Sequence, residues 1–140
     1  MKKLLHLDFL PRSTDLALLA LRLWYGLSML LLHGWGKLAG FSEMKAKFSG
    51  MFGLSPTGTL ALAIVGEVLC TVLLVLGLWT RLAALGAATT MFVAFWIAHG
   101  HKLTGSGSGE MAFLYLGAFV ALFLAGGGRY AVDAKLGAKN

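Results

Sequence analysis

Four stretches of this 140-residue chain are dominated by apolar residues, and short polar segments separate them. A helix needs about 20 apolar residues to cross the hydrocarbon core of a bilayer, and these runs approach or reach that length. The pattern predicts an all-α, integral membrane four-helix bundle in a single transmembrane domain over residues 1–140. The four transmembrane helices are expected at about 15–38, 58–78, 82–99 and 110–125.

Local signals mark where these helices begin and end. Ser13 or Thr14 is suited to cap the start of the first helix, since a hydroxyl can accept from a free amide of the first turn. Trp79-Thr80-Arg81 predicts a tight turn, which would make the second and third helices antiparallel neighbours. Residues 100–109 are rich in glycine and serine, and the fourth helix is expected to end at Gly126-Gly127-Gly128.

Composition agrees with a membrane location. Hydrophobic residues make up 58% of the chain and charged residues only 13%, with a mean hydropathy of +0.78. About 25% of the residues of an ordinary soluble domain are charged, so a water-soluble fold is excluded. The net charge of +6 comes from basic residues between and around the apolar runs. We therefore attribute this charge to membrane topology and anionic lipid contact, and expect no nucleic-acid binding.

An even number of transmembrane helices places both termini on one side of the membrane. That side carries seven basic residues, at positions 2, 3, 12, 81, 129, 135 and 139, whereas the other carries four, at positions 37, 45, 47 and 102. Because basic loops stay in the cytoplasm, both termini are predicted to be cytoplasmic.

Two charged residues interrupt the apolar runs: Arg22 in the first and Glu67 in the second. Each would cost several kcal/mol alone in lipid, so such residues usually face the bundle interior, pair with each other, or mark a functional site. One interpretation is a structural ion pair that joins the first two helices. The other is that one or both residues line a ligand or proton site.

A second polar cluster is expected at the outer end of the bundle. His33 and Lys37 close the first helix, His99 closes the third, and Glu110 opens the fourth. Three interpretations stay open: two histidines that hold a haem or metal ion, a polar mouth for a quinone or another small lipophilic ligand, and an inert cluster in interfacial water.

Small residues and the single cysteine are assigned to packing. Cys70 has no partner for a disulfide within the chain. Gly36-x-x-x-Gly40 and the small residues between Ala83 and Ala88 allow helices to approach closely, within one chain or in a homo-oligomer.

The chain resembles the DoxX family of small four-span membrane proteins over about Leu16 to Asp133. The residues that carry the resemblance are Leu21-Arg22-Leu23 with Gly26, His33-Gly34 with Lys37, Gly66-Glu67, Gly77 to Ala84, the His99 region, Glu110 to Tyr115, and Gly126 to Tyr130 with Asp133. The resemblance implies a four-helix bundle in the bacterial cytoplasmic (inner) membrane. It also implies a link to quinone oxidoreductases and redox partner proteins, and matches Arg22, His33, Lys37, Glu67, Arg81, His99 and Glu110 to the family's polar positions.

These observations lead to a functional hypothesis: a redox-associated membrane protein that binds a quinone, with haem as the less favoured cofactor. In this hypothesis Arg22 and Glu67 form a central pair, His33 and His99 hydrogen-bond the ligand's head group, and Lys37 and Glu110 tune the histidines. No residue is assigned a catalytic role. The rival hypotheses are a non-catalytic subunit or assembly chaperone that docks on partner transmembrane proteins, and a small transporter that works as an oligomer.

Overall fold

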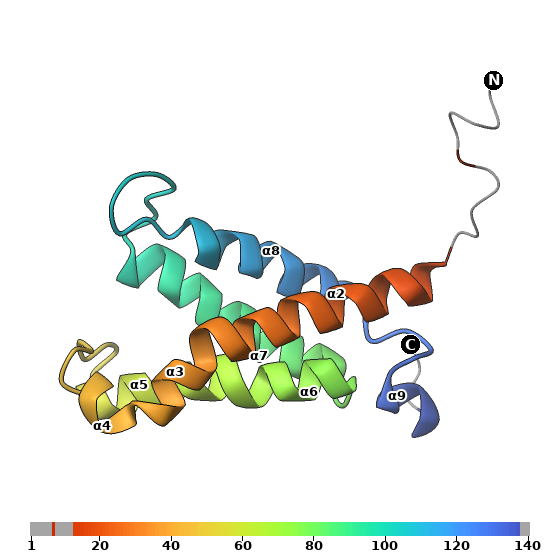
Figure 1. Cartoon of the computed structure of the whole chain (residues 1–140), viewed down its shortest axis with the longest axis horizontal. Coiled ribbons are helices and arrows are strands. Elements are labelled where there is room, and N and C mark those ends of the chain that lie inside the picture. Colours follow the sequence, from red (N-terminus) through yellow and green to blue (C-terminus); the bar gives the residue numbers. More distant parts are fainter. Residues whose placement is uncertain (1–6, 8–12, 138–140) are drawn as a thin grey trace.

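The computed structural model describes Leu7 and residues 13–137, and these residues form helices and connections without a β-strand. Three long helices and one shorter helix run roughly side by side (Figure 1). The first long helix is α2 (Thr14–Met29), η1 (Leu30–Gly34) and α3 (Trp35–Ala39); the second is α5 (Pro56–Ile64), η2 (Val65–Leu69) and α6 (Cys70–Leu76); the third is α7 (Thr80–Val93) and η3 (Ala94–Ala98); α8 (Glu110–Ala125) follows, and α4 (Phe41–Met44) and α9 (Val132–Lys135) are single turns.

The three long helices have 26, 21 and 19 residues and are apolar enough to cross a membrane. α8 is also apolar but has 16 residues, which is about 24 Å of helix against a hydrocarbon core of about 30 Å. Many large apolar side chains on these helices are exposed on the outside of the bundle, among them Trp24, Leu32 and Leu82. Such a surface is suited to lipid.

The expected helix boundaries agree closely with the observed ones. The exception is the turn between the second and third helices, which lies two residues earlier than expected. Ser13 caps α2 by accepting a hydrogen bond from the Leu16 amide, at 3.2 Å. α6 ends earlier than expected because Gly77 is left-handed and Leu78 N–H bonds back to the Leu73 carbonyl at 2.9 Å. The turn therefore lies at 77–79, and Thr80 already begins α7.

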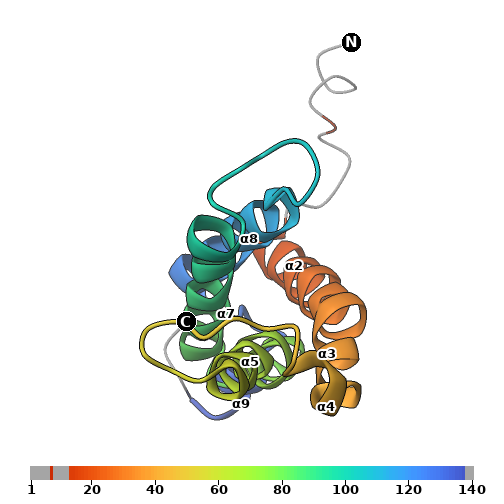
Figure 2. The same ribbon diagram turned by 90° about the vertical axis from the view of Figure 1, so that its left-hand side faces the viewer.

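The four helices form a ring (Figure 2), in which α2 contacts α6 and α8, and α7 contacts the same two helices from the other side. The second and third long helices are antiparallel neighbours, as the tight turn predicted. Ala83, Ala84, Ala87 and Ala88 are buried, which confirms that these small residues serve close packing.

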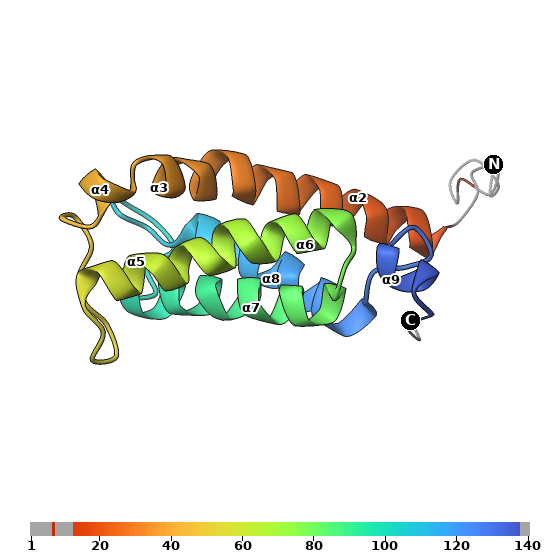
Figure 3. The same cartoon turned by 90° about the horizontal axis from the view of Figure 1, so that it is seen from below.

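The two ends of the bundle differ, as Figure 3 shows. One end carries the start of α2, the turn at 77–79 and α9, and we call it the α9 end. The other carries the connections 40–55 and 99–109, and we call it the loop end. Lys2, Lys3, Arg12 and Lys139, which entered the charge count, lie outside the described residues.

Candidate functional site

Each of the three long helices contains one π-helical turn, at Leu30–Gly34, Val65–Leu69 and Ala94–Ala98. These turns were not predictable from the sequence, since a π turn holds one extra residue and leaves no composition signal. π turns are frequent at functional sites. Here the first two contact each other, and they hold His33 and Glu67.

The π turn in the first helix changes which side chain faces the interior. Arg22, Gly26 and Met29 form a buried stripe, as a regular α-helix predicts, but the next buried residue is Gly34. His33 is only half-buried, and its ring packs edge-on against Tyr115 with centroids 5.5 Å apart. A regular α-helix would place His33 on the same face as Arg22, but the extra residue of the π turn rotates the helix and places Gly34 there instead.

The charged partner of Glu67 is Lys37. Lys37 Nζ lies 2.5 Å from Glu67 Oε2 and 3.5 Å from the His33 carbonyl oxygen. The two side chains are 20% and 7% exposed, so this ion pair is largely enclosed by protein. The predicted Arg22–Glu67 pair is wrong: Arg22 reaches the Leu74 carbonyl instead, seven residues or about 10 Å further along the second helix.

A glycine brings the two helices close enough for this pair. A Cβ atom at Gly34 would lie 2.6 Å from the Glu67 carbonyl oxygen and 2.8 Å from Val68 Cγ2. Only a residue without a side chain fits at this distance. The His33-Gly34 and Gly66-Glu67 motifs of the sequence are thus in contact through their backbones.

The Lys37–Glu67 pair forms part of the wall of a cavity of about 720 Å³. The cavity lies between the second and third long helices and the connection that follows α4. Its other lining residues are Phe48, Met51, Phe52, Leu54, Thr59, Leu62, Ala63, Val65, Gly66, Cys70, Leu82, Leu85, Gly86, Thr89, Thr90, Val93, Ala94, Ala98 and His99. Of the six residues predicted to bind ligand, Lys37, Glu67 and His99 line this cavity, whereas Arg22, His33 and Glu110 do not.

Most of the polar atoms in the cavity wall are already bonded within the protein. Thr89 and Thr90 donate their hydroxyl protons to the Leu85 and Gly86 carbonyls, at 2.8 and 3.1 Å. By contrast, Glu67 Oε1 accepts no hydrogen bond from any described residue, and Lys37 has a donor left after its two bonds. The ion pair is therefore the main polar feature that this wall offers to a ligand.

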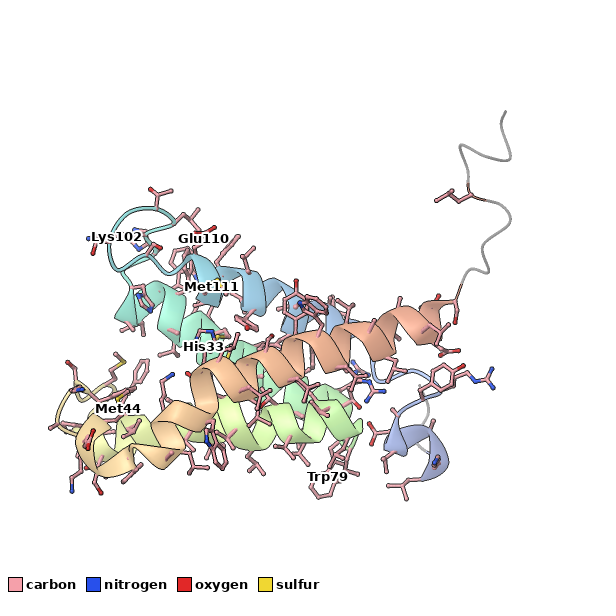
Figure 4. The ribbon with its side chains drawn as sticks, in the orientation of Figure 1. His33, Met44, Trp79, Lys102, Glu110 and Met111 are labelled. Carbon is pink, nitrogen blue, oxygen red and sulfur yellow. The ribbon has the colours of Figure 1, made fainter. Side chains whose placement is uncertain are left out.

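The outer cluster does not form a single site. His99 is exposed, and its Nδ1 lies 3.0 Å from the Gly107 carbonyl oxygen. Glu110 is exposed at the first turn of α8, next to the connection 99–109, as Figure 4 shows. Within the described residues, no three His, Cys, Asp or Glu side chains come close enough to hold a metal ion.

Arg22 lies near the α9 end and is fully buried. Its guanidinium donates to the carbonyl oxygens of Leu74 and Val75, at 3.1 and 3.2 Å, and to that of Tyr130 at 3.2 Å. The last carbonyls of a helix lack partners within the helix, so Arg22 caps α6 from a neighbouring helix. Its Nε has no hydrogen-bond partner among the described residues.

Asp133 completes the same turn from the C-terminal segment. Its carboxylate accepts hydrogen bonds from the amides of Trp79 and Thr80, at 2.7 and 2.8 Å, and from the Thr80 hydroxyl at 2.7 Å. Burial raises the pKa of this carboxyl, but these hydrogen bonds and the charge of Arg22 outweigh burial and hold the pKa below its usual value. No local pattern links Asp133 to Thr80, 53 residues earlier, so sequence reasoning had no signal for this contact.

Comparison with known proteins gives two matches. The sequence model of the DoxX family matches residues 17–100, a segment that contains Lys37, Glu67 and His99. The chain is also similar to an uncharacterized protein of Haemophilus influenzae, with 33% identity over 115 residues that cover 76% of this chain and 81% of that protein. No solved structure matches the chain.

Proposed function

The chain belongs to the DoxX family of multi-pass membrane proteins, and we propose that it is a redox-associated component that binds a quinone or another small lipophilic molecule in the cavity beside Lys37 and Glu67. One observation carries this proposal: an enclosed ion pair with unused hydrogen-bonding capacity lines a mostly apolar cavity. Ligand sites commonly combine apolar walls with a few placed polar groups in cavities of about 300–1,000 Å³.

The wall suits a quinone. Lys37 would donate to a carbonyl oxygen of the head group, and Glu67 Oε1 would accept from a hydroxyl of the reduced form. His99 lies at the loop-end margin of the same cavity. A bound quinone would supply reversible electron and proton transfer, which no side chain of this cavity supplies by itself.

The other three predicted residues do not line the cavity. The His33 carbonyl accepts from Lys37 and so helps to position the ammonium group. Arg22 caps α6 at the α9 end, outside the cavity. Glu110 lies at the start of α8 and takes no part in the site.

The proposal includes a topology. Residues 1–140 form a single transmembrane domain in the bacterial cytoplasmic membrane, with four spans and both termini in the cytoplasm, so the α9 end is the inner end. α8 is short for a span, and a modest local thinning of the bilayer accommodates it.

In a Cys70→Ala background, a membrane-impermeant maleimide added to intact cells should label Ser106→Cys but not Lys135→Cys. Equal labelling of both would overturn the four-span topology.

The first test of function is a reduced-minus-oxidised difference spectrum of protein purified in mild detergent. A change confined to the ultraviolet supports bound quinone. Sharp visible bands would replace quinone by haem and promote His33 and His99 to ligand candidates. A flat spectrum would favour the alternative below.

A variant pair sharpens this test. Glu67→Gln removes the carboxylate from the cavity wall and should abolish binding of added decylubiquinone while the protein still folds. Glu43→Gln, an exposed position on α4, is the matched control and should bind as the parent does. Unchanged decylubiquinone binding in Glu67→Gln would contradict the proposed site.

The alternative function is a non-catalytic subunit or assembly chaperone, and Gly36 favours it. This glycine is exposed on α3 and has no atom within 4 Å of the position where a Cβ would lie. An open glycine on a lipid-facing helix suits close contact with another transmembrane helix. A stoichiometric partner that co-purifies with the parent and is lost in Gly36→Leu would support this function.

A further inference from the structure

We infer that the ligand of this cavity has a small uncharged head and an apolar chain, and that it enters sideways from the hydrocarbon core between the second and third long helices. This inference rests on the proposed function, because it concerns the same cavity. It adds the chemical class of the ligand and its route. Three features of the cavity carry it: its depth, its lipid-facing opening and its apolar wall at the loop end.

The polar wall lies deep in the membrane. Thr59 lines the cavity in the first turn of the second helix, and Glu67 follows eight residues later, which is about 12 Å along the axis. Glu67 is also the twelfth of the 21 residues of this helix, Pro56–Leu76, which crosses the bilayer in the proposed topology, so the ion pair lies near the middle of that span.

This depth selects the head group. A phosphate or another charged head loses its hydration on reaching this depth, and burial of a net charge is costly. The Lys37–Glu67 pair carries no net charge to compensate such a head. It offers one donor and one acceptor instead, which complement an uncharged head that bears carbonyl or hydroxyl groups.

The opening of the cavity faces lipid. Val65 and Leu62 on the second helix and Leu82 and Leu85 on the third line the cavity and are also exposed on the outer surface of the bundle. Val65 is 45% exposed and Leu82 is 68% exposed, so neither side of the opening is covered by protein. A chain attached to the bound head has an apolar path from the ion pair into the bilayer.

The connection that follows α4 forms the wall of the cavity at its loop end. Phe48, Met51 and Phe52 from this connection form a wall of the cavity, and Figure 2 shows the connection crossing the end of the bundle beside α5 and α7. The Met51 amide donates to Thr59 Oγ1 at 3.0 Å, which fixes the connection to the start of the second helix. A water-soluble ligand would have to displace this apolar wall, whereas a membrane-dissolved ligand would not.

The apolar chain of the ligand supplies little of the binding affinity. A chain in the opening leaves one apolar environment for another, since lipid tails are as apolar as leucine side chains. Recognition therefore resides in the head and the ion pair, and the opening sets only what fits through it. Chain length should matter less than the presence of a hydrogen-bonding head.

The test uses photolabelling of the full-length protein in phosphatidylcholine vesicles. The probe is hexadecanol that carries a diazirine in its chain, and labelled peptides are mapped by mass spectrometry. We expect saturable labelling of the segments around Val65 and Leu85, reduced to background by excess unlabelled hexadecanol. A phosphatidylcholine probe with the same diazirine chain should label these segments no more than the lipid-facing side of α2. Equal, unsaturable labelling of all exposed helices by both probes would mean annular lipid only and would overturn the inference.

Leu85→Trp narrows the opening without changing the ion pair, and it should abolish the saturable labelling. Leu27→Trp, an exposed position on α2 outside the cavity lining, is the matched control and should label as the parent does. Saturable labelling that survives Leu85→Trp would contradict sideways access.

Competition by decylubiquinone separates this inference from the proposed function. If hexadecanol labelling is saturable but decylubiquinone does not compete, the lipid-accessible site stands and quinone binding fails. If decylubiquinone binds while the segments around Val65 and Leu85 stay unlabelled above background, the proposed function stands and the sideways route fails.

Discussion

Arg22 and Asp133 hold the two sides of one turn, the turn between α6 and α7. Arg22 donates to carbonyl oxygens at the C-terminal end of α6, and Asp133 accepts from amides at the N-terminal end of α7. A positive charge at a helix C-terminus and a negative charge at an N-terminus both complement the helix dipoles. Arg22 also donates to the Tyr130 carbonyl, so the segment after α8 is fixed to the same place.

Loss of the Arg22 cap should destabilise the bundle without removing the ligand site. Arg22→Leu leaves the half-buried carbonyls of Val75 and Tyr130 without this donor, whereas Leu74 keeps the Gly77 amide, and we expect a cost of about 1–3 kcal/mol in the free energy of unfolding. Thermal unfolding in detergent measures the loss, and decylubiquinone binding below the unfolding temperature should be retained. Arg129→Leu, whose side chain is exposed, is the control. If Arg22→Leu keeps the stability of the parent but fails to bind decylubiquinone, Arg22 is part of the ligand site.

The hydrogen bonds of Asp133 predict that the stability of the folded protein depends on pH. The pKa of this carboxyl in the folded protein is lowered, so the charged carboxylate stabilises the folded state at pH values above its unfolded pKa of about 3.9. That stabilisation is lost as the pH falls through the lower, folded-state pKa. The Tm of the parent should therefore exceed that of Asp133→Asn near neutral pH, and the difference should shrink as the pH falls below about 4. A Tm difference that is constant down to acid pH would show that the carboxylate charge is not the cause.

A double-mutant cycle on Lys37 and Glu67 separates stability from binding. Lys37→Met or Glu67→Leu alone leaves one enclosed charge without its partner, and each should cost about 2 kcal/mol or more. The double variant removes both charges and should recover most of that loss, because apolar pairs often replace buried ion pairs at little cost. Its ligand binding should stay lost, since the donor and acceptor are gone. Additive losses in thermal unfolding would mean that the two charges do not interact.

Much of the helical architecture was predictable because its signals are local. Long apolar runs, the Ser13 cap and the glycines after α8 each act within a few residues, and the structure follows them closely. The end of α6 at Gly77 was not predicted, since the second helix was expected to continue through this glycine. The alanines of α7 were also assigned correctly to packing, since small residues at helical spacing have few other uses in a membrane helix.

The pairing of charges was not predictable in the same way. The expectation that Arg22 would meet Glu67 assumed regular helices and compared depth alone. The π turn at Leu30–Gly34 changes the helix phase, and the long Lys37 side chain reaches Glu67 from the loop end. Arg22 instead donates to backbone carbonyls at the C-terminal end of α6, and no side-chain pattern in the sequence reveals such partners. Backbone partners and helix phase are set by tertiary structure. The sequence therefore shows where the polar residues lie along each helix but not which groups they contact.

The Gly34 and Gly36 positions, two residues apart on the first helix, give the sharpest test of how the ion pair is positioned. A Cβ atom at Gly34 would meet the Glu67 carbonyl oxygen at 2.6 Å, and a backbone atom cannot move aside as a side chain can. Gly34→Ala must therefore push the first and second helices apart, which we expect to cost about 1–3 kcal/mol and to weaken ligand binding by disturbing Lys37 and Glu67. Gly36→Ala meets no atom within 4 Å and should leave stability unchanged or raise it by up to about 1 kcal/mol, because alanine favours a helix more than glycine does. Thermal unfolding and decylubiquinone binding, measured on both variants in parallel, check these outcomes. Equal effects at the two positions would show that backbone contact at Gly34 does not position the pair, and a loss confined to Gly36→Ala would point instead to a partner helix on that face.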